Sequence, residues 1–470
     1  MADILIIGSG LGGLSAATLL ARDGHRVTVL ERDPDQPPPV ERAGEAWDGW
    51  QRRGVNQFHL PHFMLPRWWA QMREEIPELW PTLRAAGALQ FNTVAALPET
   101  MRGPLRADDD RFDTVTARRP VLEAAMSAVA EAAGATIHRG VTVTGFITDR
   151  RFRVPRITGV LTDRGQAIRA DVVVDSCGRR SALGSWLSSV GARPPDEERE
   201  DSGFIYYARH FRSRTGQMPV QAGTLIQNCD SVTVLTLPGD RETWSVVLTI
   251  SSKDKAMRAL RNPATWHAVL QRYPLAAHWA DGVPISGLDV FGGIEDRHRC
   301  LLVDGEPIAT GVLALADAWA CTNPSLGRGA SLAILHARLL RDLLRETEPE
   351  DHDKLVRRFH EATTRVAEPL FRTTLWYDRH RLAEIEADFA GEPYRPADPR
   401  WAVTKALTAA GLTDADLLRE QSSITAFLAT GQEVLARPGV LDRTMALGAG
   451  APQYPLPGPT RAELLATIGA

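Results

Sequence analysis

The pattern of apolar residues changes its period along the first part of the chain. Residues 4–7 form an apolar run, residues 14–23 place apolar side chains at helical spacing, and residues 27–30 form a run rich in β-branched residues before Glu31. Short apolar runs bounded by turn residues are typical of buried strands, whereas spacings of three and four residues are typical of a helix. This part of the chain therefore predicts a βαβ unit of a parallel sheet.

The same reasoning divides the rest of the chain into regions. Helical or apolar strand patterns occur at 119–133, 135–146, 157–161, 170–174, 312–318 and 330–344. Apolar and polar residues alternate at 204–211, 231–237 and 243–250, as in a half-buried sheet. We expect an α/β protein with a Rossmann-like nucleotide-binding domain at 1–195 and 285–345, a sheet-based α+β substrate domain at 196–284, and a mostly helical region at 346–470.

The composition is that of an ordinary globular protein. Hydrophobic residues make up 44% and charged residues 24% of the 470 residues, which excludes a disordered or fibrous chain. The net charge of −4, with acidic and basic residues interspersed, argues against a nucleic-acid partner. No apolar run approaches the roughly 18 residues that span a bilayer, and the separated cysteines give no metal signal. We expect a cytoplasmic protein with no integral membrane segment.

A glycine fingerprint connects the first predicted strand to the first predicted helix. Gly8, Gly10 and Gly13 fit G-x-G-x-x-G, in which glycines allow a tight turn and close approach of the backbone to a pyrophosphate. The following helix would direct its N-terminus at that anion. Glu31, at the end of the second strand, would accept hydrogen bonds from a ribose, with Arg32 beside it. NAD and FAD share this fingerprint, so the turn alone leaves the dinucleotide open.

Further segments carry motifs of one family. Residues 311–318 and 323–331 read GVLALADA and NPSLGRGAS, residues 171–181 read DVVVDSCGRRS, and residues 119–123 read RPVLE. These segments resemble the FAD motifs of flavoprotein monooxygenases of the para-hydroxybenzoate hydroxylase fold. Residues 53–62, RGVNQFHLPH, are similar to a segment of bacterial polyene epoxidases and their uncharacterised relatives. The chain departs from the pattern at Ala316, where the family usually has Gly, and at Cys177, where the aromatic hydroxylases usually have Asp.

The resemblance implies non-covalently bound FAD and a set of residues that contact it. Asp317 would hold ribityl or pyrophosphate oxygens, and the segment after it would aim a helix N-terminus at the flavin. The residues that the resemblance assigns to FAD, in addition to the first turn, Glu31 and Arg32, are Arg53, Gln57, Arg119, Asp317, Pro324, Gly327 and Gly329.

Other conspicuous residues allow a functional and a structural interpretation. His59, His62 and Trp319 are candidates for catalysis near the flavin, but single histidines and tryptophans are also common as buried structural residues. Tyr207 and Arg209 lie on the predicted strand 204–211, where side chains alternate between a pocket and the opposite face. They are candidates for lining the substrate pocket, and simple packing of the sheet explains them equally well.

The resemblance implies an FAD-dependent monooxygenase of specialised metabolism that hydroxylates or epoxidises an apolar or aromatic small molecule through a flavin C4a-hydroperoxide. Two alternatives keep FAD: a dehydrogenase or ene-reductase, and a non-redox cyclase in which FAD is structural. The sequence contains one dinucleotide fingerprint, so electrons would come from transiently bound NAD(P)H or from a separate flavin reductase. Because Cys177 stands where the aromatic hydroxylases usually have Asp, we favour a separate flavin reductase as the electron donor.

Overall fold

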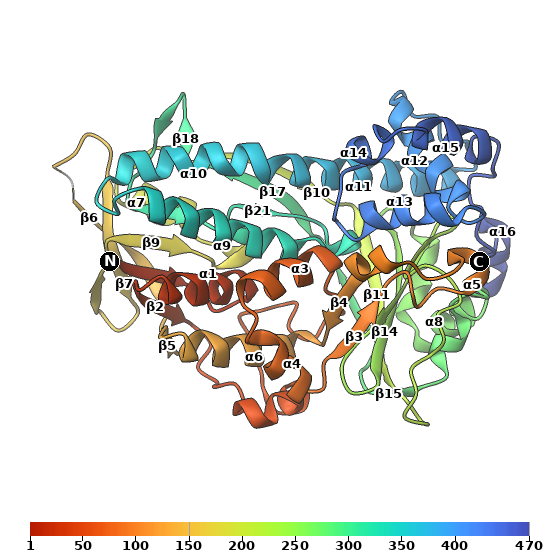
Figure 1. The fold of residues 1–470 in the computed structure, drawn as a ribbon, viewed down its shortest axis with the longest axis horizontal. Helices are drawn as coiled ribbons and strands as arrows, with labels where there is room; N and C mark the ends of the chain where they lie inside the picture. The colour runs from red at the N-terminus through yellow and green to blue at the C-terminus, as the bar shows by residue number, and fades with distance from the viewer. Residues whose placement is uncertain (150, 470) are drawn as a thin grey trace.

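A parallel sheet forms the centre of the first lobe in the computed structural model, which describes residues 1–149 and 151–469 (Figure 1). Its strands lie in the order β20 (Val312–Ala314), β9 (Val172–Asp175), β1 (Asp3–Ile7), β2 (Arg26–Glu31) and β5 (Thr136–Arg139). All neighbouring pairs are parallel. Strands from three distant parts of the sequence meet in this sheet, which confirms the predicted α/β class and its Rossmann-like core.

The two faces of this sheet have different covers. Ile4 and Ile6 of β1 pack with the helices α1 (Leu11–Arg22), α6 (Arg119–Ala132) and α9 (Gly329–Glu346). Leu5 and Ile7 point to the other face, where they join the side chains of an antiparallel sheet of β6 (Val143–Asp149), β7 (Arg156–Thr162) and β8 (Ala167–Arg169). Because β1 is buried on both faces, its sequence is continuously apolar.

A second sheet forms the other lobe. It runs in the order β12 (Ile226–Asn228), β13 (Thr233–Pro238), β14 (Thr243–Ser251), β11 (Phe204–Arg212) and β15 (Val283–Pro284), and β16 (Asp289–Gly292) also pairs with β11. The helix α8 (Pro263–Leu270) covers one face, where Trp266 and Leu248 belong to the same hydrophobic cluster. The helix α11 (Glu368–Ala390) contacts the other face through Ile385. Every residue of β14 is therefore buried.

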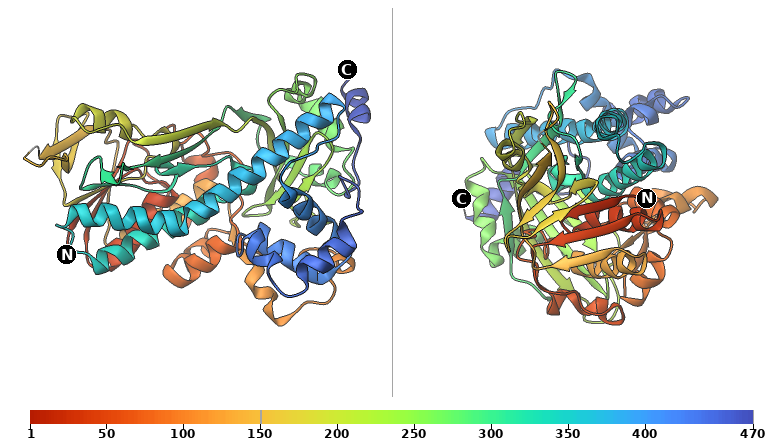
Figure 2. Two further views of the ribbon diagram at one scale, coloured as in Figure 1. Left: turned by 90° about the horizontal axis from the view of Figure 1, so that it is seen from above. Right: turned by 90° about the vertical axis from the view of Figure 1, so that its left-hand side faces the viewer.

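Two long helices connect the lobes. α10 (His352–Val366) packs against α9, and α11 continues from it nearly end to end toward the second sheet (Figure 2). A three-stranded antiparallel sheet of β10 (Asp196–Asp201), β17 (Glu295–Cys300) and β21 (Ala320–Cys321) also joins the two lobes. The C-terminal helices α12 (Pro399–Ala410), α13 (Ala415–Thr425), α14 (Gly431–Leu435), α15 (Val440–Gly448) and α16 (Arg461–Ile468) complete the chain.

The elements follow most of the predicted regions, with two differences. β16 pairs with β11, so the second sheet takes a strand from beyond residue 284. α10 lies on the first lobe, so the helical region after residue 346 is shared between both lobes. The domain bounds themselves stay a prediction. The remaining elements are α2 (Ala46–Gly49), α3 (Pro66–Glu75), α4 (Leu79–Ala85), β3 (Leu89–Asn92), α5 (Glu99–Arg102), β4 (Asp113–Thr116), α7 (Leu183–Ser189), β18 (Leu302–Val303) and β19 (Glu306–Pro307).

Within the described residues, no helix combines the length and the apolar character that crossing a membrane requires.

Candidate functional site

The first glycine turn joins β1 to α1. Gly8 has a φ of +101°, and a Cβ on Gly13 would lie 2.1 Å from the Gly8 carbonyl oxygen, so the helix can start this close to the strand only without side chains there. Gly10 differs, because a Cβ there would have Arg119 Nη2, at 3.7 Å, as its nearest neighbour. α1 has no acidic residue in its first turn. The free N–H groups at its start therefore favour an anion in front of Gly10.

A buried charge cluster lies behind this turn. Glu31 accepts hydrogen bonds from Ser9 N–H at 2.9 Å and from the Ser9 hydroxyl at 2.9 Å. Arg52 forms ion pairs with Glu31 and Glu123, and their side chains are 2%, 5% and 0% exposed. Burial alone would raise the pKa of both carboxyls, but the Arg52 charge and the hydrogen bonds hold each pKa below its usual value. Arg52 therefore fixes the carboxylate that the sequence assigns to ribose.

A second turn follows β20 and packs on the first. Ala316 has a φ of +53°, in the left-handed region that favours glycine, which explains why related sequences usually carry Gly at this point. His336 Nδ1 accepts the Ala316 N–H at 3.0 Å and holds this conformation. Asp317, the next residue, makes no hydrogen bond within the described chain, and burial raises the pKa of its carboxyl. Its oxygens are thus free to accept hydrogen bonds from a ligand.

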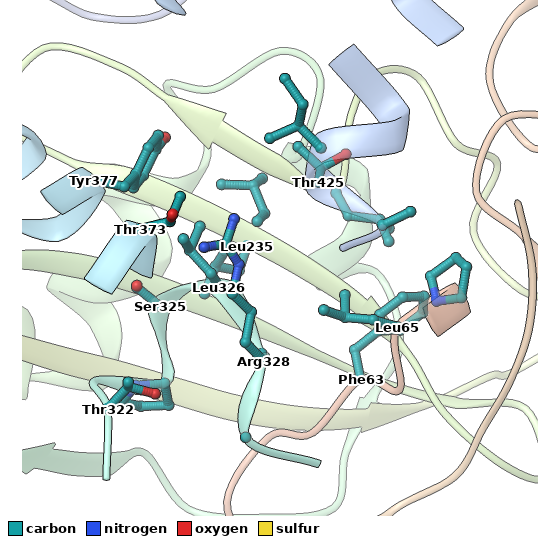
Figure 3. A pocket seen from close by; sticks show the side chains of 18 of the residues that line it. Phe63, Leu65, Leu235, Thr322, Ser325, Leu326, Arg328, Thr373, Tyr377 and Thr425 are labelled. Carbon is teal, nitrogen blue, oxygen red and sulfur yellow. The ribbon is translucent and has the colours of Figure 1, made fainter. Parts of the chain in front are cut away.

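One cavity of about 1160 Å³ begins at the two turns. Near its start lie Gly10, Asp317 and the N-terminus of α9, which has no acidic residue in its first turn. It then passes between the sheet of the second lobe and the C-terminal helices, as the close view shows (Figure 3). The wall of this inner part is largely apolar and aromatic, and includes Phe63, Leu65, Leu225, Ile226, Leu235, Leu237, Phe291, Trp376 and Trp401.

A network of buried polar groups supports the second turn from the side of α11. Asn323 accepts a hydrogen bond from the Tyr206 hydroxyl and donates its N–H to Asp296 at 2.6 Å. Ser325 donates to Asp378 at 2.6 Å. Burial raises the pKa of Asp296 to about 6 and that of Asp378 to about 7. This network fixes the loop before α9, whose residues line the cavity.

Many of the sequence-predicted site residues lie together on this cavity. They are Gly10, Gln57, His62, Arg119, Asp317, Pro324, Gly327 and Gly329. Arg119 connects this group to the charge cluster, because its Nε donates to Glu123 at 2.7 Å. Gly8 and Gly13 shape the turn from behind, and Glu31 is in the charge cluster.

The structure does not bring the other candidates to the cavity lining. Arg32 and Arg53 are exposed, and Arg52 occupies the buried position instead. His59 contacts the Trp47 carbonyl oxygen, and Trp319 packs edge-on against His336.

The substrate-pocket assignment of Tyr207 and Arg209 is not supported. Tyr207 is buried with Trp266 on the side of α8, and Arg209 contacts the Ser286 carbonyl oxygen. Tyr206 points to the opposite face and reaches Asn323. Neighbouring residues of a strand point to opposite faces, so the cavity receives the side of Tyr206 and not that of Tyr207.

Three groups of site residues carry little or no signal in the sequence. Arg52 is the neighbour of Arg53, which was predicted to contact FAD. The only sequence feature that points to Arg52 is that these two arginines stand together before Gly54. Arg328 lies inside the predicted second turn and was not distinguished from its neighbours. The cavity residues of α11, α12 and α13 had no signal, because their amphipathic pattern predicts burial without naming the partner.

The start of the cavity fits the pyrophosphate and flavin parts of a dinucleotide. Gly10 leaves space where a Cβ would otherwise stand, and two helix N-termini without acidic residues meet there. Asp317 offers an unpartnered carboxylate for hydroxyl groups. The residues that would hold FAD are Gly10, Gln57, Arg119, Asp317 and Gly329, with Glu31 behind the turn.

The parallel sheet and the glycine turn after β1 define an α/β protein with a Rossmann-like dinucleotide-binding domain. Residues 6–37 match the family described as NAD(P)-binding Rossmann-like domain. "Protein Rv3254" of Mycobacterium tuberculosis is 27% identical over 405 residues, 78% of each chain. Aklavinone 12-hydroxylase RdmE of Streptomyces purpurascens is 54% identical over 43 residues, 9% of this chain and 8% of the hydroxylase.

Solved structures show the same fold. PqsL of Pseudomonas aeruginosa, a probable FAD-dependent monooxygenase, superposes with a TM-score of 0.57 and 19% identity over 82% of this chain and 96% of its own. The flavin-dependent halogenase CmlS has a TM-score of 0.58 and 16% identity over 99% and 76%. The chain therefore shares the fold of these two flavin-dependent proteins, which agrees with the fold that the sequence motifs predicted.

Proposed function

We propose that the protein is an FAD-dependent monooxygenase that hydroxylates or epoxidises an apolar or aromatic small molecule. The observation that carries this proposal is a cavity that joins the turns at Gly10 and Asp317 to an apolar and aromatic wall. A cofactor held at Gly10 and Asp317 would place its reactive ring at the entrance to that wall. The similarity to a probable monooxygenase and, over a short segment, to a hydroxylase supports the same reaction class.

The residues of this chain would bind, orient and exclude water. The N-termini of α1 and α9 would stabilise negative charge on the cofactor, and Asp317 would accept its hydroxyl groups. Apolar side chains such as Leu235 and Phe291 would keep water from the reacting atoms. Bound FAD, once reduced, would supply the activation of dioxygen and the transfer of one oxygen atom.

His62 is the one predicted catalytic candidate on the cavity lining. Its Nδ1–H donates to the Leu60 carbonyl oxygen at 2.9 Å, which leaves Nε2 as an acceptor. Burial, together with the nearby Arg119 charge, lowers the pKa of His62 to about 4. The imidazole is therefore neutral at neutral pH and would orient a hydrogen-bond donor of the substrate or cofactor.

In this proposal the reducing equivalents come from transiently bound NAD(P)H or from a separate flavin reductase. The chain has one dinucleotide fingerprint, and this proposal assigns it to FAD.

The oxygen atom in the product tests the proposed reaction. Reduced enzyme would be mixed with a small-molecule extract of the producing cells under ordinary or heavy dioxygen, and the products compared by mass spectrometry. We expect a product that gains one heavy oxygen atom from labelled dioxygen. A product that only gains or loses two hydrogens would instead establish a dehydrogenase or reductase, and turnover without any flavin redox change would establish a cyclase.

A further inference from the structure

Arg328 carries an uncompensated positive charge at the cavity. No carboxylate of the described chain forms an ion pair with it, although it lines the cavity and is only 5% exposed. The other arginine and lysine side chains of the lining all have acidic partners: Arg119 with Glu123, Arg372 with Glu198, Arg400 with Asp398 and Lys405 with Glu384. Arg328 therefore differs from them in having its charge free for a ligand.

The guanidinium of Arg328 is held in a fixed orientation. Its Nη1 donates to the Thr374 hydroxyl at 2.9 Å, and that hydroxyl donates to the Leu370 carbonyl oxygen at 3.0 Å. Its flat face lies 4.7 Å from the centre of the Phe427 ring. Phe427 itself has a φ of +62°, which an aromatic residue rarely adopts. A conformation that costs free energy thus places the ring against the cation.

One edge of this guanidinium has no partner. Nε is buried and unpaired, and Nη2 makes no hydrogen bond within the described residues. Asp378 is the nearest acid in electrostatic effect, but its carboxylate is used by Ser325 and Asn323. Burial lowers the pKa of Arg328 to about 10, so the side chain is still charged at neutral pH. In Figure 3 the side chain extends among Leu235, Leu326 and Thr373.

A buried charge without a counter-ion is costly, and an arginine edge matches the two oxygens of a carboxylate. We propose that Arg328 binds a carboxylate group of the substrate, and that the substrate is an aromatic carboxylic acid whose ring system lies on the apolar wall. This proposal rests on the proposed function, because it assigns the inner cavity to substrate. Trp376 and Trp401 line the same chamber and would contact the apolar part of the acid.

The test compares two probes of nearly the same shape, 2-naphthoate and its uncharged amide, 2-naphthamide. Binding to the FAD-loaded protein would be followed by flavin absorption and by tryptophan fluorescence. We expect Arg328→Met to weaken 2-naphthoate binding by about 10- to 100-fold, because a charged hydrogen-bonded pair is lost, and to leave 2-naphthamide binding nearly unchanged. Arg328→Lys should recover part of the lost affinity, since lysine restores the charge but not the two parallel N–H donors of the guanidinium.

Arg67→Met is the matched control. Arg67 lies 5.3 Å from the same Phe427 ring but does not line the cavity. It should change the affinity for either probe by no more than about twofold. Equal affinity of wild type and Arg328→Met for 2-naphthoate, or equal losses for both probes, would overturn the proposal. So would a change in FAD content or flavin potential without a change in 2-naphthoate binding. None of these readouts requires oxygen transfer, so failure of the monooxygenase proposal would be recognised separately.

Discussion

Gly10→Val should yield a folded but colourless protein. A Cβ at Gly10 meets no protein atom closer than Arg119 Nη2 at 3.7 Å, and the backbone there has φ −80° and ψ −178°, which valine readily adopts. The new side chain would instead fill the space in front of the N-terminus of α1, where the pyrophosphate must pass. We expect loss of nearly all bound flavin, measured by absorption of the purified protein, with unchanged circular dichroism.

Gly13 and Gly287 provide the contrasts for this variant. A Cβ on Gly13 would lie 2.1 Å from the Gly8 carbonyl oxygen, so Gly13→Val should be insoluble or unfolded. Gly287 is exposed and has open space around it, so Gly287→Val should keep both the fold and the flavin. Normal flavin content in Gly10→Val would show that the pyrophosphate of the cofactor does not lie in front of Gly10.

Arg52→Met should destabilise the protein strongly. Removal of the guanidinium leaves Glu31 and Glu123 buried close together without their shared cation. Breaking a buried ion pair from one side typically costs about 3–5 kcal/mol. The free energy of unfolding would be measured by chemical denaturation of the apoprotein, so that any loss of cofactor binding does not contribute.

Arg53→Met is the matched control for this measurement. Arg53 is the next residue, but its side chain is exposed and forms no ion pair within the described chain. Its substitution should change the free energy of unfolding by no more than about 0.5 kcal/mol. If the two variants were equally stable, the cluster behind the first turn would not hold the nucleotide lobe together as the structure implies.

The parts of the fold that the sequence predicts well are those with local signals. The fingerprint at Gly8, Gly10 and Gly13 fixes a strand, a turn and a helix within a short segment, and the structure contains all three. At Ala316 the chain departs from the family's usual glycine, but the backbone conformation is the same. The residue keeps the left-handed conformation that glycine usually provides, with His336 holding its N–H.

The parts that the sequence predicts poorly depend on contacts between distant segments. The alternation at 204–211 identifies a strand with two faces. Which face is directed at the loop before α9 becomes clear only from the distant contact between Tyr206 and Asn323. Likewise, nothing local distinguishes Arg52 from Arg53, because their segment has no period. Arg328 has no ion-pair partner because the carboxylate of Asp378, the nearest acid, accepts hydrogen bonds from Asn323 and Ser325, and no motif records this.

The cofactor that the protein carries decides between two dinucleotides, because the matched domain family is named for NAD(P) whereas the cavity and its second turn favour FAD. The wild-type protein would be purified, denatured by heat, and its released cofactor identified by chromatography and quantified against protein. We expect FAD, released without covalent attachment, at about one molecule per chain. Release of NAD(P) alone, or a purified protein that neither contains nor takes up FAD, would contradict it.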